Sequence, residues 1–209
     1  MRVWWSRLGG LVLLAAPPLA AAELALALVD PTIDAPYESV ALFGAFSVVT
    51  YLVVVPWLEA AVVALHDDPR SPRRAYTRAA ERIHALAGAT LVYNVALVVG
   101  LVLLIVPGLL VGARWGLYFA AHGLGDGYGT ASLRRSNDMV RGKTRLVLGV
   151  LALVFLMSLL ASIPGGVLFA LEDPFASWAG GALIDLAFVT LFGTAASVLY
   201  RRLGEDRTG

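Results

Sequence analysis

The chain has 209 residues, of which 59% are hydrophobic and 15% charged, and its mean hydropathy is +0.78. These values exclude a water-soluble globular domain of this length and indicate that the whole chain lies in a lipid bilayer, with no polar segment long enough for a separate catalytic domain. The net charge is +1, and the absence of cysteine excludes disulfides, thiol nucleophiles and thiolate metal sites.

Apolar runs recur along the chain and predict membrane-spanning helices, because a helix satisfies its own backbone polar groups in lipid. Six spans are expected, at about residues 8–29, 39–65, 83–106, 109–124, 146–163 and 178–200. The expected fold class is therefore all-α: a polytopic transmembrane helical bundle of about six spans that forms one integral membrane domain over residues 1–209.

The first apolar run has two interpretations. Its basic start, short apolar core and small residues resemble a signal peptide that would be cleaved after Ala22. The apolar run resumes after Glu23 as LALALV, however, so a full-length span is the other interpretation. Both interpretations leave the orientation of the remaining chain unchanged.

Charge alternates from one connection to the next. All 16 lysines and arginines except Arg114 lie at the two termini, between the second and third spans, or between the fourth and fifth. The remaining connections carry only acidic residues or no charge. The positive-inside rule therefore predicts a multi-pass protein of the bacterial cytoplasmic (inner) membrane, with both termini cytoplasmic.

Two basic stretches, at about residues 70–84 and 130–142, alternate charged and apolar residues at helical spacing. Both are expected to form amphipathic helices on the cytoplasmic surface, where arginines attract anionic lipid head groups. The candidate head-group ligands are Arg73, Arg74, Arg78, Arg134 and Arg135. Nucleic-acid binding is disfavoured, because the flanking spans tether both helices to the bilayer.

Pro107-Gly108 interrupts an apolar stretch that would be about 60 Å long as one helix, about twice the hydrocarbon thickness. A tight hairpin at this point is expected, since proline disfavours helix in the residue before it and glycine permits a turn. Residues 78–108 and 135–165 can also be aligned as an internal repeat, in which Pro164-Gly165 matches Pro107-Gly108.

Residues 103–151 resemble the integral membrane domain associated with some bacterial glycerophosphoryl diester phosphodiesterases and its stand-alone uncharacterised relatives. The residues that carry the resemblance are Pro107, Gly108, Arg114, Ser136 and Gly142, with Tyr200 and the basic residues after it at the end of the last span. The resemblance, which covers about residues 39–203, implies a six-helix membrane module of undefined function. The His-Arg and acidic metal-binding motifs of the catalytic part of those enzymes do not occur in this sequence.

Charged residues inside spans are costly and usually have partners. Arg114 and Asp185 are expected at a similar depth in the fourth and sixth spans, which suggests a buried charge pair acting as a static clasp or in transport. Glu59 is expected to form a buried polar cluster with Tyr93 and Asn94, as a structural contact or a proton site.

Small residues recur every fourth position along the fourth span, at Gly108, Gly112 and Gly116. Such a stripe permits close helix packing, either within the chain or between two copies of it. Histidines and carboxylates near the cytoplasmic surface match no strict metal-binding motif, so neither a metal site nor a cofactor is expected.

The function expected is that of a non-enzymatic accessory or scaffold subunit in the bacterial envelope, which contacts membrane lipids and either another membrane protein or a second copy. The alternative is a small transporter or channel that uses Arg114, Asp185 and Glu59. An intramembrane enzyme is the least favoured interpretation, because the sequence shows no catalytic constellation at membrane depth.

Overall fold

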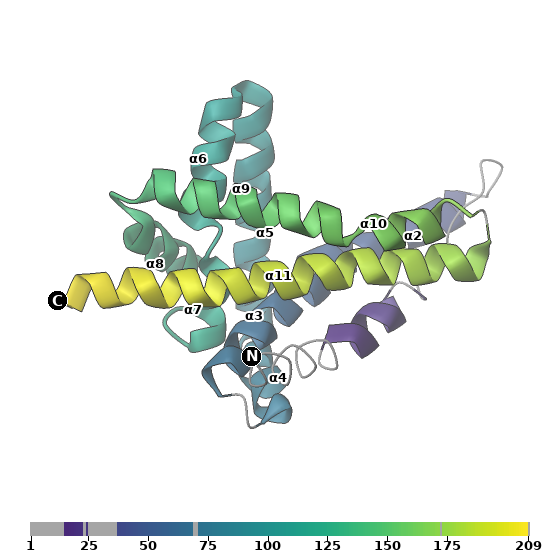
Figure 1. Cartoon of the computed structure of the whole chain (residues 1–209), viewed down its shortest axis with the longest axis horizontal. Coiled ribbons are helices and arrows are strands. Elements are labelled where there is room, and N and C mark those ends of the chain that lie inside the picture. Colours follow the sequence, from purple (N-terminus) through teal and green to yellow (C-terminus); the bar gives the residue numbers. More distant parts are fainter. Residues whose placement is uncertain (1–14, 23, 25–36, 69–70, 172, 209) are drawn as a thin grey trace.

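The computed structural model describes residues 15–22, 24, 37–68, 71–171 and 173–208, and every regular element in these ranges is a helix (Figure 1). The elements are α2 (Tyr37–Val49), the π-helix η1 (Thr50–Val54), α3 (Val55–Asp67), α4 (Pro72–Ala80), α5 (Ile83–Leu103), α6 (Ile105–Trp115), α7 (Tyr118–Leu124), α8 (Thr130–Val140), α9 (Thr144–Ala161), α10 (Ile163–Phe169) and α11 (Pro174–Thr208). Residues 15–22 are also helical. The all-α class is confirmed.

Four described stretches are long and apolar enough to cross a membrane: Ala41–Asp67, Ile83–Leu103, Thr144–Ala161 and Phe175–Glu205. They coincide with the second, third, fifth and sixth expected spans. Most of the first expected span lies outside the described residues. The expected fourth span is divided between α6 and α7, because Leu117 adopts φ −97° and ψ 13° and interrupts the helix.

Helix α3 forms the centre of the packed core. Its residues from Ala60 to Leu65 are all buried, and α4, α7 and α11 pack around it. Glycines make these approaches possible: a β-carbon on Gly123 of α7 would collide with the Ala60 carbonyl oxygen, and one on Gly193 of α11 would lie 2.6 Å from Val62 Cγ1. Small residues at helix contacts allow backbones to approach closely where lipid supplies no hydrophobic driving force between helices.

The chain reverses direction between α5 and α6. Leu104 is extended, with φ −162° and ψ 132°, and α6 folds back along α5. A β-carbon on Gly100 would lie 2.9 Å from Gly108 Cα, so the two backbones meet at these glycines. Pro107 lies in the first turn of α6, where its missing N–H leaves no hydrogen bond unmade. The reversal thus comes three residues before the expected turn at Pro107-Gly108.

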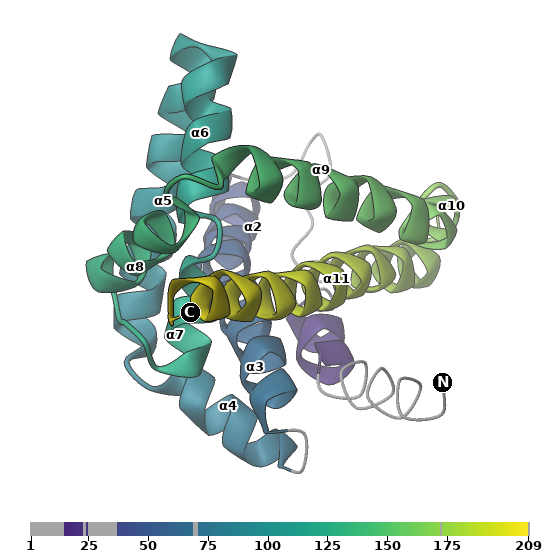
Figure 2. The same ribbon diagram turned by 60° about the vertical axis from the view of Figure 1, so that its left-hand side comes forward.

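The α5–α6 hairpin projects across the direction of α9 and α11, as Figures 1 and 2 show from two sides. Its tip is strongly apolar and exposed, and Val102 is 79% exposed. Helices α9 and α10 instead lie along α11. Near the start of α11, the Trp178 indole donates a hydrogen bond of 2.9 Å to the Ala20 carbonyl oxygen, which ties residues 15–22 to α11.

The end of α3, helix α4 and the last turns of α11 meet at an arginine-rich end of the molecule. Asp67 accepts hydrogen bonds from Arg78 of α4 at 3.2 Å and from Arg201 of α11 at 2.9 Å. On the same end, the Tyr200 hydroxyl donates to Asp126 Oδ2 at 2.9 Å, which links α11 to the segment before α8. The basic segments after α3, after α7 and at the end of α11 therefore converge in space.

Candidate functional site

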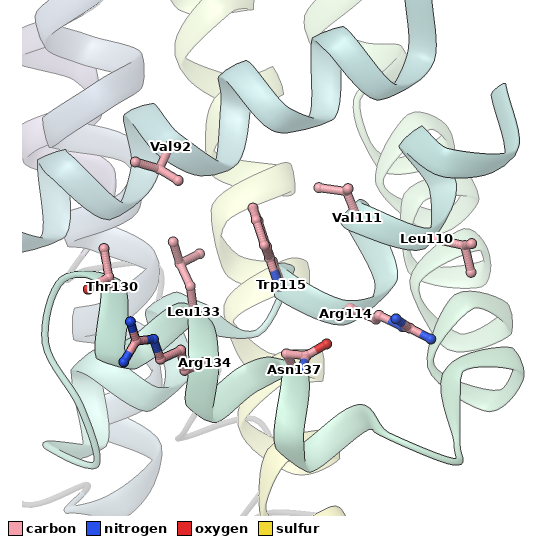
Figure 3. A pocket seen from close by; sticks show the side chains of 9 residues that line it. All are labelled: Val92, Leu110, Val111, Arg114, Trp115, Thr130, Leu133, Arg134 and Asn137. Carbon is pink, nitrogen blue, oxygen red and sulfur yellow. The ribbon is translucent and has the colours of Figure 1, made fainter. Parts of the chain in front are cut away.

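The first candidate site is a cavity of about 510 Å³ between α5, α6 and α8, which we call the arginine cavity (Figure 3). Its lining residues are Val92, Leu110, Val111, Arg114, Trp115, Thr130, Leu133, Arg134 and Asn137. Figure 3 shows Asn137 between the two arginines, whose side chains extend toward opposite ends of the cavity. The cavity therefore has a cationic, hydrogen-bonding side and an apolar side.

Helix α8 brings two of these polar side chains to the cavity because it is amphipathic. One of its faces is buried and consists of Ser132, Leu133, Ser136, Met139 and Val140. Because these residues face the core, Arg134 lies on the exposed face of α8 and Asn137 is half-buried at the edge of the buried face.

Ser136 fastens α8 to the break between α6 and α7. Its hydroxyl donates a 2.7 Å hydrogen bond to the Arg114 carbonyl oxygen and accepts one of 3.2 Å from the Leu117 amide. Ser136 is fully buried, so it satisfies two backbone groups that the interrupted helix cannot pair. This contact sets the position of Arg114 and Trp115 relative to α8.

The arginine cavity has the chemistry of an anion site. Guanidinium groups bind phosphate and carboxylate oxygens through several N–H donors, and Asn137 and Thr130 add neutral hydrogen-bonding groups. Because the two guanidinium groups are on opposite sides of Asn137, the arrangement suits an extended anionic head group better than a single small anion. The apolar side, with Val92, Leu110 and Val111, suits a hydrocarbon chain.

The second candidate site is a cavity of about 370 Å³ between η1, α3, α5, α7, α9 and α11, which we call the carboxylate cavity. Its lining residues are Tyr51, Val55, Glu59, Tyr93, Gly116, Tyr118, Phe119, Leu151, Phe155, Asp185, Phe188, Val189 and Phe192. Two carboxyl groups thus face a space whose walls are mostly aromatic. None of the described residues that line it is basic.

The π-helix shapes one wall of the carboxylate cavity. Pro56 cannot donate a hydrogen bond within the helix, and the π-helical turn from Thr50 to Val54 precedes it with only Val55 between them. Tyr51, Val55 and Glu59 repeat at every fourth residue through this turn, and all three line the cavity. Wider π turns of this kind often occur at functional sites.

The predicted pairs are rearranged in the structure. Arg114 lines the arginine cavity, whereas Asp185 lines the carboxylate cavity together with Glu59 and Tyr93. Asn94 is not among the residues that line this cavity. Asp185 therefore shares its cavity with a second carboxyl group, and Arg114 lines a different cavity beside α8.

The glycine stripe faces α5 at two of its three positions. A β-carbon on Gly108 would lie 2.5 Å from Leu101 Cγ, and one on Gly112 would lie 3.5 Å from Leu97 Cδ1. On Gly116 it would meet the Gly112 carbonyl of the same helix and Leu151 of α9. These contacts are all within the chain.

The predicted head-group residues are exposed at the arginine-rich end: Arg73, Arg74 and Arg78 on α4, and Arg134 and Arg135 on α8. The Tyr200 hydroxyl beside Arg135 raises the pKa of that guanidinium further above its usual value. In the loop between α7 and α8, partial burial and the nearby Glu81 carboxylate raise the pKa of Tyr128, whose hydroxyl donates to Glu81 at 3.2 Å.

The histidine and carboxylate residues of this end make separate contacts. His122 is fully buried, with Nε2 3.2 Å from the Ala79 carbonyl oxygen, and its ring lies edge-on to Tyr128. Asp67 pairs with arginines and Asp126 with Tyr200. In the part of the chain that the structure describes, no group of three or more His, Cys, Asp or Glu is arranged to hold a metal ion.

Comparison of the chain with protein families, with curated proteins and with solved structures found no match. The resemblance to the phosphodiesterase-associated membrane domain therefore stays a prediction that depends on the residues quoted for it. Of those residues, Ser136 donates a hydrogen bond to the Arg114 carbonyl oxygen, and Arg114 lines the arginine cavity.

Sequence reasoning missed Trp115, Asn137 and Ser136 as parts of one site. The helical spacing of Leu133, Ser136 and Val140 was a usable signal, because it places Ser136 on the buried face of α8. No sequence signal indicated that this face would pack against the break between α6 and α7.

Proposed function

We propose that this protein is a non-enzymatic accessory or scaffold subunit of the bacterial cytoplasmic membrane, held there by apolar helices and by anionic phospholipid at its arginine-rich end. The observation that carries the proposal is the convergence of three basic segments, through Asp67 and Asp126, next to a cavity lined by Arg114 and Arg134. Clustered arginines beside apolar helices favour anionic head groups, at about 1 kcal/mol per residue near the surface.

The lipid part of the proposal is tested by native mass spectrometry of protein extracted in mild detergent. Wild-type protein is expected to retain phosphatidylglycerol or cardiolipin, whereas the double variant Arg114→Gln with Arg134→Gln retains several-fold less, because two charge-assisted contacts are removed. Arg145→Gln is the matched control, since Arg145 is exposed and does not line the cavity. Equal lipid loss in control and double variant would contradict the proposal.

The same spectra test the accessory role. A partner protein in fixed stoichiometry is expected in the wild-type preparation. A preparation that contains only this chain, with a bound small molecule in place of a partner, would contradict the accessory role and support transport.

Membrane sidedness is a separate prediction. The chain has no cysteine, so single cysteines can be introduced at Ser71, Gly142 and Ala170 and labelled with an impermeant maleimide. Ser71→Cys and Gly142→Cys are expected to react only after the membrane is permeabilised, and Ala170→Cys in intact cells, because basic connections stay on the cytoplasmic side. Labelling of Ser71→Cys and Gly142→Cys on opposite sides would exclude the six-span arrangement.

A small transporter is the second candidate function, and the carboxylate cavity is the observation that favours it. Carboxyl groups within membrane-spanning helices are costly and mark ion or substrate pathways in many membrane proteins. Arg114 lines a different cavity from Glu59 and Asp185, which favours the accessory role over a single polar path that uses all three charges.

A further inference from the structure

The carboxylate cavity combines two features that together recognise organic cations. Glu59 of α3 and Asp185 of α11 place their carboxyl groups at the same cavity, although they are far apart in sequence. Among the described residues, no hydrogen bond or ion pair engages the Glu59 carboxyl group. The Glu59 carboxyl group therefore has no partner there that would compete with a ligand.

Aromatic rings surround the carboxyl groups. Phe188 of α11 packs edge-on to Phe155 of α9, with ring centroids 5.9 Å apart, and stacks on Phe192 at 6.1 Å. Two further lining residues, Tyr93 and Tyr118, have ring centroids 5.3 Å apart. The negative faces of aromatic rings attract cations, and quaternary ammonium groups are commonly bound in such aromatic cages.

The remaining lining residues favour an organic cation over a small metal ion. A small metal ion needs several oxygen ligands, whereas the walls of this cavity are aromatic and aliphatic apart from the carboxyl and tyrosine groups. A volume of about 370 Å³ suits a compact organic molecule. Several of its walls belong to helices apolar enough to cross a membrane, and lipophilic cations partition into bilayers.

We infer that the carboxylate cavity is a binding site for a monovalent lipophilic organic cation, such as a quaternary ammonium or phosphonium compound. Glu59 and Asp185 attract the cation, and Phe155, Phe188 and Phe192 contact its apolar body. The site is separate from the arginine cavity, so the inference does not depend on the proposed lipid-binding role.

The test is equilibrium dialysis of radiolabelled tetraphenylphosphonium against the full-length protein in detergent, with protein-free micelles as the blank. Wild-type protein is expected to bind one equivalent saturably. Glu59→Gln and Asp185→Asn are each expected to weaken binding about tenfold or more, because an apolar site then lacks one counter-charge. Phe188→Leu keeps side-chain bulk without a ring, and about threefold to tenfold weaker binding is expected.

Two controls separate charge recognition from general apolar binding. Tetraphenylborate has the same shape and the opposite charge, so it is expected not to compete. Glu205→Gln removes a carboxylate from the exposed end of α11 and is expected to bind like wild type.

The inference is overturned if tetraphenylborate competes as well as unlabelled tetraphenylphosphonium, or if both carboxyl variants bind with wild-type affinity. Should Glu59→Gln aggregate, Asp185→Asn and the borate competition on wild-type protein decide the question. Neither result bears on lipid retention at the arginine cavity, so failure here and failure of the proposed function are distinguishable.

Discussion

Replacement of Gly123 by alanine is expected to destabilise the protein by about 2 kcal/mol, because overpacking of a tight helix contact typically costs this much. The added β-carbon would collide with the Ala60 carbonyl oxygen and lie 3.2 Å from Ala60 Cα. Both atoms belong to the backbone of α3, which cannot move aside as a flexible side chain would. Helix α7 must therefore shift away from the core.

The measurement is the thermal unfolding midpoint in detergent, followed by the fluorescence of the five tryptophans. Gly88→Ala is the matched control, because a β-carbon on Gly88 of α5 has no atom within 4 Å. Its midpoint is expected to equal or slightly exceed that of wild type, since alanine favours helix. Equal midpoints for Gly123→Ala and Gly88→Ala would show that α7 does not pack on α3 in this way.

Replacement of Ser136 by alanine is expected to cost about 2 kcal/mol, since two backbone groups at the helix break each lose their hydrogen bond to the buried Ser136 hydroxyl. The groups are the Arg114 carbonyl oxygen and the Leu117 amide, both of which bond to the Ser136 hydroxyl at the break between α6 and α7. Lipid retention is also expected to fall, although no arginine is changed, because α8 no longer holds its position beside Arg114.

Ser162→Ala is the control for this variant. The Ser162 hydroxyl donates only to the Leu159 carbonyl oxygen of its own helix turn, at 2.9 Å and in an exposed position. Its loss is expected to change stability by less than about 0.5 kcal/mol. If Ser136→Ala unfolds at the same temperature as Ser162→Ala, the hydroxyl does not fasten α8 to the break.

Two proline-glycine breaks show which features of the fold could be predicted from the sequence and which could not. Pro107-Gly108 and Pro164-Gly165 were aligned as equivalent ends of an internal repeat, and each does lie in the first turn of a new helix. Just before the first break the chain reverses, because Leu104 is extended. At the second, Ser162 keeps helical angles of φ −86° and ψ −3°, and α10 continues alongside α11.

Packing partners explain this difference. Gly100 and Gly108 let α6 lie directly against α5, so a reversed chain gains close contact there. A β-carbon on Gly165 would instead lie 2.6 Å from the Gly180 carbonyl oxygen, which shows that α10 packs on α11. The local sequence predicts a break at each proline-glycine pair. It does not predict which helix packs against the glycine of that pair.

By itself, the sequence determined that the chain is helical and apolar enough for a membrane, because long apolar runs must satisfy their backbone hydrogen bonds internally. The tertiary structure alone decided which charged residues share a cavity. Asp185 of α11 lines the same cavity as Glu59 of α3, while Arg114 of α6 and Arg134 of α8 line another. Depth along a span can be counted from the sequence, but the direction in which a side chain points depends on helix rotation and on close contacts at glycines such as Gly123 and Gly193.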